Sequence, residues 1–155
     1  MHLQAQRVQH ALLASGCNSQ VRELPDSTRT AAEAAQACNC VIGQIVKSLI
    51  FILDPPGKPI LVLVSGNNRV DETHLGALLG AVLKKAPADF VQQVTGFVIG
   101  GVPPLAHASP IPTYLDQDLL QYEIVWAAAG TPHAVFPIDP RELLRITAAD
   151  LVPVK

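Results

Sequence analysis

Two apolar segments separated by a short turn constrain the fold of this chain more than any other feature. Residues 45–53 (IVKSLIFIL) are apolar and rich in β-branched side chains, which predicts a buried strand. The next residues, 54–58 (DPPGK), have the composition of a turn. Residues 59–64 (PILVLV) then predict the second strand of a hairpin. The chain is therefore expected to fold around a β-sheet.

Helical and strand patterns alternate along the rest of the chain, without a repeat or a low-complexity tract. Thr30-Ala-Ala-Glu33 is a capping-box pattern at the start of an alanine-rich helix. Four prolines between residues 103 and 112 exclude regular structure there. The interleaving predicts one mixed α/β domain over residues 1–155. We expect helices over 3–15, 30–38, 71–83 and 88–93 and from Asp139-Pro140 onward, and further strands over 97–99, 123–129 and 134–138.

The composition excludes several classes of protein. Of the 155 residues, 49% are hydrophobic and 15% are charged, and the net charge of −2 argues against disorder. The 11 basic residues are scattered, with Lys84-Lys85 as the only adjacent pair, so a surface for duplex DNA is not expected. No apolar run approaches the roughly 20 residues of a membrane span.

The cysteines and the N-terminal residues indicate a reducing compartment. The chain has three cysteines, an odd number without a CxxC pair, so neither a disulfide framework nor a zinc ribbon is expected. Cys38-Asn-Cys40 is too closely spaced for an ordinary disulfide or the usual zinc site. Residues 1–7 lack the apolar core of a signal peptide. We expect a cytoplasmic protein that holds neither metal nor cofactor.

The distribution of charge points to a lined pocket or to a plain buried core. Residues 90–115 and 124–138 carry no formal charge. Lys47 is the only charged residue between Glu33 and Asp54, inside a strand of apolar neighbours. An unpaired buried ammonium is costly, so Lys47 either meets an anion, is paired within the fold, or extends its stem along apolar surface to water.

Two loops carry further candidate chemistry. Gly100-Gly-Val-Pro-Pro104 could aim backbone N–H groups at a carbonyl or an oxyanion, or it could be a rigid connector. Gly130-Thr-Pro-His133 offers a hydroxyl and an imidazole, or is a solvated loop. His107 could equally be a core histidine, and Asp116 could be a helix cap. The motifs GxSxG, HExxH, the P-loop and GxGxxG do not occur.

Taken together and in order, several short motifs resemble the freestanding aminoacyl-tRNA deacylases of the YbaK/ProX type, which are relatives of the editing domain of bacterial prolyl-tRNA synthetases. The resemblance runs from about residue 25 to residue 150. No single motif is specific, but six occur in register. They are residues 30–35 (TAAEAA), 44–49 (QIVKSL), 64–66 (VSG), 95–104 (TGFVIGGVPP), Ile111-Pro…Asp116 and 128–130 (AAG).

The resemblance implies a curved mixed sheet flanked by helices and hydrolysis of mischarged tRNA. The lysine of the family falls on Lys47, where it would hold a phosphate near the terminal adenosine. The G-x-x-x-P loop of the family falls on Gly100–Pro104. The backbone amides of Gly100, Gly101 and Val102 would bind the aminoacyl carbonyl and the attacking water. The free ribose hydroxyl of the substrate would assist.

Departures from the family bear on the amino acid that is removed. Ala129 stands where some members have serine, and Ser48 stands where the alanine-directed branch has asparagine. His133 matches a histidine of some branches that could limit amino-acid size. An apolar pocket closed by the single cation Lys47 suits alanine, serine, threonine or 2-aminobutyrate. The residues expected to contact substrate are Thr30, Ser48, Pro104, His107, Asp116, Gly130, Thr131 and His133.

The sequence therefore predicts a trans-editing esterase that removes a wrong small amino acid from the 3′ end of tRNA, with tRNA for proline as the expected substrate. Prolyl-tRNA synthetase is a candidate partner. The alternative is a catalytically silent module that docks on a synthetase or on tRNA.

Overall fold

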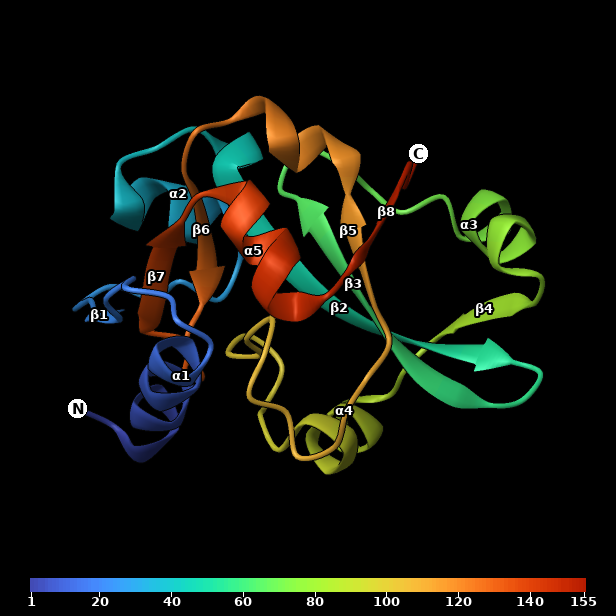
Figure 1. Ribbon diagram of the computed structural model, residues 1–155, viewed down its shortest axis with the longest axis horizontal. Helices are drawn as coiled ribbons and strands as arrows, with labels where there is room; N and C mark the ends of the chain where they lie inside the picture. Colours follow the sequence, from blue (N-terminus) through green and yellow to red (C-terminus); the bar gives the residue numbers. More distant parts are fainter.

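A mixed sheet of eight strands runs through the molecule, with five α-helices around it (Figure 1). The computed structural model describes all residues from Met1 to Lys155. The strand order is β1-β7-β6-β2-β3-β5-β8, and β4 also pairs with β2. The strands are β1 (Arg22–Glu23), β2 (Ile45–Asp54), β3 (Lys58–Ser65), β4 (Val82–Lys85), β5 (Thr113–Asp116), β6 (Val125–Ala128), β7 (Ala134–Ile138) and β8 (Asp150–Val152).

Side-chain caps define where the helices begin. Thr30 and Glu33 form the complete capping box expected at the start of the second helix. Asp71 and Asp139 cap two later helices, and Pro140 occupies the first turn of the last one. The α-helices are α1 (Leu3–Ala14), α2 (Ala31–Cys38), α3 (Glu72–Leu79), α4 (Ala88–Thr95) and α5 (Pro140–Thr147), and the 3₁₀ helices are η1 (Ile42–Gln44) and η2 (Gln117–Gln121).

Both faces of the central hairpin are buried. Successive side chains of a strand point to opposite faces of the sheet. Leu61 and Leu63 of β3 enter the larger core, which α1, α4 and α5 cover, whereas Val62 and Val64 enter the smaller core under α3. Figure 1 shows α3 beside β4, at a distance from α1. Because both faces are covered, the hairpin strands are apolar at nearly every position.

One edge of β2 is interrupted, and this gap positions the site. Along one side, β2 pairs with β3 from Val46 to Leu53. On the other side, β6 pairs only with residues 45–46 and β4 only with residues 51–54. Residues 47–50 therefore have no strand partner on that side. The carbonyl of Ile45 points toward β3, because it accepts a hydrogen bond from the N–H of Gly66. The direction of the backbone N–H and C=O groups alternates from residue to residue along an antiparallel strand. The N–H and C=O of Ser48 therefore point away from β3, toward the gap.

The mixed α/β architecture and the curved sheet flanked by helices are confirmed, but two predicted elements are wrong. Residues 97–99 form a bend and a turn and not a strand, because they follow the Gly96 cap of α4 and pair with no strand. The helix predicted to reach residue 83 ends at Leu79, since Gly80 adopts a left-handed conformation. Residues 82–85 then form β4 on the edge of β2. No helix has the length and apolarity that crossing a membrane requires.

Candidate functional site

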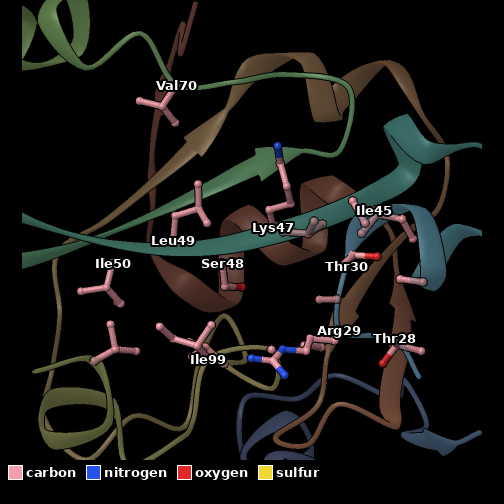
Figure 2. Close-up of a pocket in the computed structure, with 18 of the residues that line it drawn as sticks. Thr28, Arg29, Thr30, Ile45, Lys47, Ser48, Leu49, Ile50, Val70 and Ile99 are labelled. Carbon is pink, nitrogen blue, oxygen red and sulfur yellow. The ribbon is translucent and has the colours of Figure 1, made fainter. Parts of the chain in front are cut away.

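A cavity of about 500 Å³ opens at the interrupted edge of β2 (Figure 2). Of its 25 lining residues, 16 are hydrophobic. Residues 47–50 of β2 form one wall, α2 forms another, and the ends of β4 and β6 close it on either side. Both uncharged stretches of the sequence contribute to the lining: Val91, Ile99, Gly100 and Val102 from the first, and Trp126, Ala127, Ala128 and Val135 from the second.

Lys47 and Ser48 reach this cavity on opposite faces of the sheet, because they are consecutive residues of a strand. Figure 2 shows Lys47 extending toward the loop that carries Val70, whereas Ser48 extends toward Arg29 and Ile99. A substrate that contacts both residues must therefore cross the open edge of β2.

Lys47 is a half-buried cation without an acidic partner at ion-pair distance. Its Nζ donates a hydrogen bond to the backbone carbonyl of Asn68 at 2.5 Å. Burial lowers the pKa of Lys47 from its ordinary value, the carboxylate of Asp116 opposes this effect, and the guanidinium of Arg69 adds to it. Two of the three donor positions of the ammonium remain for an anionic ligand.

Asp116 acts on the charge of Lys47 but does not line the cavity. It is 1% exposed, and its Oδ2 accepts from Ser65 N at 3.0 Å and from Asn68 Nδ2 at 2.8 Å. Its Oδ1 accepts from the N–H of Asp118, so Asp116 is the N-terminal cap of η2, as one interpretation of the sequence predicts. Asp116 therefore holds the loop that contains Asn68, and the backbone carbonyl of Asn68 accepts the hydrogen bond from Lys47.

The side-chain hydroxyl of Ser48 is unpaired. Its Oγ is buried and is the only buried side-chain nitrogen or oxygen in the chain without a hydrogen-bond partner. Native proteins pair nearly all buried polar atoms, so this atom calls for an explanation.

The Gly100–Pro104 loop has two backbone amides without a hydrogen bond, both at residues that line the cavity. Gly100 and Val102 line it, and neither N–H makes a hydrogen bond within the chain. The expectation that Gly101 would also donate is wrong for this conformation, because its N–H already bonds the carbonyl of Val98 at 3.0 Å. A Cβ on Gly101 would lie 2.9 Å from the backbone of Gly130, and the N–H of Gly130 bonds the carbonyl of Gly101 at 2.9 Å. Gly101 and Gly130 therefore fix the loop by close backbone packing.

Five other predicted contact residues also lie outside the cavity lining: Pro104, His107, Gly130, Thr131 and His133. Pro104 is buried. His107 Nε2 donates to the carbonyl of Pro103 at 2.7 Å and so braces the loop, and burial lowers the pKa of this imidazole. His133 is exposed, and Gly130 and Thr131 border a separate, smaller hollow. Of the predicted substrate contacts, Thr30 and Ser48 line the cavity.

Three cations that the sequence did not single out join Lys47 in the cavity lining. Arg29, Arg69 and Lys85 line it, and none of them forms an ion pair. Glu72 is the only acidic residue of the lining. The expectation of a single cation is therefore wrong. These residues are far apart in the sequence, so no local signal could have found them.

The cysteines do not contribute to this cavity. Burial, with a smaller effect of Cys40, raises the pKa of Cys38 to about 11, so its thiol is a poor nucleophile at neutral pH. No three His, Cys, Asp or Glu side chains are grouped so that they could hold a metal ion.

Comparisons with known proteins found a matching family model and similar proteins. Residues 25–146 match the family model of the aminoacyl-tRNA editing domain. A solved structure described as a candidate trans-editing enzyme for prolyl tRNA synthetase is 50% identical, with a TM-score of 0.94 over 100% of this chain and 98% of that chain.

Two curated relatives are more distant. EbsC of Enterococcus faecalis (strain ATCC 700802 / V583), a candidate Cys-tRNA(Pro)/Cys-tRNA(Cys) deacylase, is 24% identical over 119 residues, which are 76% of this chain and 72% of EbsC. The proline–tRNA ligase of Limosilactobacillus fermentum (strain NBRC 3956 / LMG 18251) is 31% identical over 94 residues, which are 58% of this chain and 16% of that enzyme.

Proposed function

The chain belongs to the aminoacyl-tRNA editing domain family, and we propose that it is a trans-editing deacylase that hydrolyses the ester between a small mischarged amino acid and the 3′ end of tRNA for proline. The family membership confirms the resemblance drawn from the sequence motifs. The choice of tRNA rests on the likeness to a candidate trans-editing enzyme for prolyl tRNA synthetase and to part of a proline–tRNA ligase.

The observation that carries this proposal is the pairing of a cation with free amides across the open edge of β2. Lys47 has no acidic partner on one face, and the amides of Gly100 and Val102 are unbonded on the other. An aminoacylated nucleotide has an anionic phosphate and an ester carbonyl that suit these two positions. Lys47 would hold the phosphate by a charge-assisted hydrogen bond.

The loop amides would act on the ester itself. Water attacks the carbonyl carbon, and the carbonyl oxygen becomes an oxyanion that accepts hydrogen bonds from Gly100 and Val102. The bond to the ribose oxygen then breaks, which releases the free amino acid and the terminal ribose hydroxyl. The proton lost by the water passes to that ribose oxygen.

The cavity contains no side chain placed as a general base beside the loop amides. The titratable groups of its lining are four cations and Glu72, and Glu72 belongs to α3 on the Lys47 face. The second hydroxyl of the terminal ribose would therefore orient the water and relay the proton. Positioning of the ester would supply most of the rate enhancement.

The biological need follows from the limits of synthetase selectivity. One methylene group provides only about 1–3 kcal/mol of discrimination, so small amino acids are mischarged at rates that require hydrolysis afterwards. An apolar cavity suits alanine, 2-aminobutyrate, serine or threonine better than a charged amino acid. Such an enzyme would work in the cytoplasm, beside prolyl-tRNA synthetase.

A deacylation assay tests the proposal. Labelled alanyl-, 2-aminobutyryl-, seryl- and threonyl-tRNA for proline are incubated with catalytic amounts of the wild type and of the Lys47→Met variant. We expect the wild type to turn over at least one of them, and Lys47→Met to lower kcat/KM by about 10- to 100-fold, because a charge-assisted hydrogen bond is lost.

Lys58→Met is the matched control, because Lys58 is an exposed cation without an ion pair that lies outside the cavity. Equal activity of the Lys47→Met variant and the wild type would refute the role of Lys47. Protection of all four esters without turnover would instead support the silent binding module.

A further inference from the structure

The unpaired hydroxyl of Ser48 lies in the part of the cavity where the aminoacyl group of a substrate would bind. Val46, Ile50 and Val102 belong to the same core, and Ser48 shares the face of β2 with Val46 and Ile50. The amide of Val102 is one of the two that would hold the ester carbonyl. Lys47 would hold the phosphate on the opposite face, so the amino-acid side chain would extend along the Ser48 face.

Ser48 is also the only free hydroxyl of the cavity lining. Three hydroxyl-bearing residues line it: Thr28, Thr30 and Ser48. The Oγ1 of Thr28 donates to the carbonyl of Pro132 at 2.9 Å. The Oγ1 of Thr30 is engaged with Glu33 in the capping box. Apart from Arg29, the neighbours of Ser48 on this face are apolar, so one polar atom on the ligand could pair with the Ser48 hydroxyl.

A neutral hydroxyl on the ligand suits the position beside Ser48 better than an ammonium does. Arg29 lies on the same side of β2 as Ser48 (Figure 2). The only carboxylate of the lining, Glu72, lies on the α3 side. A positive α-amino group beside Ser48 would meet a like charge and no counter-charge, whereas a hydroxyl can both donate and accept.

From this arrangement we infer that Ser48 hydrogen-bonds the side-chain hydroxyl of the aminoacyl group, which makes seryl and threonyl esters the preferred substrates of the proposed deacylase. The inference rests on the proposed function. A site that pairs a substrate hydroxyl disfavours the analogue that lacks it, because the buried partner is then left unsatisfied. The correct product, prolyl-tRNA, has no side-chain hydroxyl and would gain nothing from Ser48.

Two pairs of esters on tRNA for proline isolate this hydroxyl: seryl against alanyl, and threonyl against 2-aminobutyryl. We expect the wild type to show a kcat/KM ratio of at least about 10 in favour of the hydroxyl member of each pair. Ser48→Ala should reduce both ratios toward 1. Ser109→Ala, at an exposed serine outside the cavity, should keep both ratios.

The outcomes separate the inference from the proposed function. A wild type that hydrolyses the esters without preferring the hydroxyl members overturns the role of Ser48 and leaves the deacylase intact. So does a Ser48→Ala variant that slows all four esters equally, because Ser48 would then act on a group common to them. A wild type that hydrolyses none of the four esters refutes the proposed function itself.

Discussion

Lys47 and Ser48 are neighbours in the sequence and have opposite surroundings in the fold. The pleat of β2 sends Lys47 toward the Asn68 carbonyl and Asp116, and sends Ser48 into an apolar wall with no partner. A charged and a neutral polar group are thereby placed on the two sides of one strand edge. Each group can make further hydrogen bonds. A ligand with an anionic part and a neutral polar part could therefore bind both.

The titration of Lys47 is testable directly. Burial lowers the pKa of Lys47 below its ordinary value of 10.5, and Arg69 lowers it further. Phosphate binding needs the ammonium, so binding should weaken as pH rises through this lowered pKa. We expect Arg69→Gln to raise the pKa of Lys47, and Lys58→Gln to leave it unchanged. NMR titration of ¹³Cε-labelled lysine measures both, and a lower pKa in Arg69→Gln would contradict the electrostatic account.

Gly101 tests whether backbone packing positions the loop. Gly101→Ala places a Cβ 2.9 Å from the backbone of Gly130, which cannot move aside easily. We expect a loss of about 1–3 kcal/mol in the free energy of unfolding, together with a lower kcat/KM, because the amides of Gly100 and Val102 are displaced. Gly57→Ala is the control: it adopts φ +89° with no atom within 4 Å, so it should cost stability through strain alone. Denaturant unfolding and deacylation distinguish the two, and full activity in Gly101→Ala would reject the positioning role.

Among the elements of the fold, two short strands create the cavity because they stop early. The partners of β2 on its open side, β6 and β4, are each four residues long and leave residues 47–50 uncovered. Helix α2 then packs beside this gap and contributes Ala31 and Ala34 to the cavity wall. The stability of the first turn of α2 therefore bears on the shape of the site.

The capping box of α2 gives a prediction with an internal control. Thr30→Ala removes the cap, and we expect a loss of about 1 kcal/mol in the free energy of unfolding together with a higher KM, because the cavity wall frays. Asp139→Ala removes the cap of α5, away from the cavity, and should cost similar stability without raising KM. Thr30→Ser keeps the cap and should restore the wild-type KM. If Thr30→Ala and Asp139→Ala change KM equally, α2 has no special role.

In the whole molecule, tertiary folding concentrates positive charge around one cavity, although the net charge of the chain is −2. Arg29, Lys47, Arg69 and Lys85 surround one cavity, and none of them is neutralised by an ion pair. The remaining basic residues are mostly paired with carboxylates or stacked on aromatic rings. Such a local concentration of positive charge suits the few phosphates of a single-stranded RNA end.

The salt dependence of tRNA binding checks this assignment. Each phosphate contact on a single strand contributes about 0.7 to the slope of log K against log salt. The double variant Arg69→Gln/Lys85→Gln should therefore bind tRNA more weakly, with a slope reduced by up to about 1.4. The double variant Lys58→Gln/Lys155→Gln removes the same charge outside the cavity and should keep the slope. Filter binding at several salt concentrations measures it, and equal slopes in both variants would rule out the cavity as the phosphate site.

The elements with local causes can be predicted from the amino-acid sequence. The apolar hairpin, the capping box at Thr30, the caps Asp71 and Asp139, and the isolation of Lys47 all follow from neighbouring residues. Which of these residues come into contact depends on tertiary packing. The gap along β2 depends on where β4 and β6 end. The N–H of Gly101 does not face a ligand because a turn bonds it to the carbonyl of Val98. Arg29, Arg69 and Lys85 come from three distant segments that meet only in the fold. Contacts of this kind are set by packing across the sheet, and packing leaves no periodic signal in the chain.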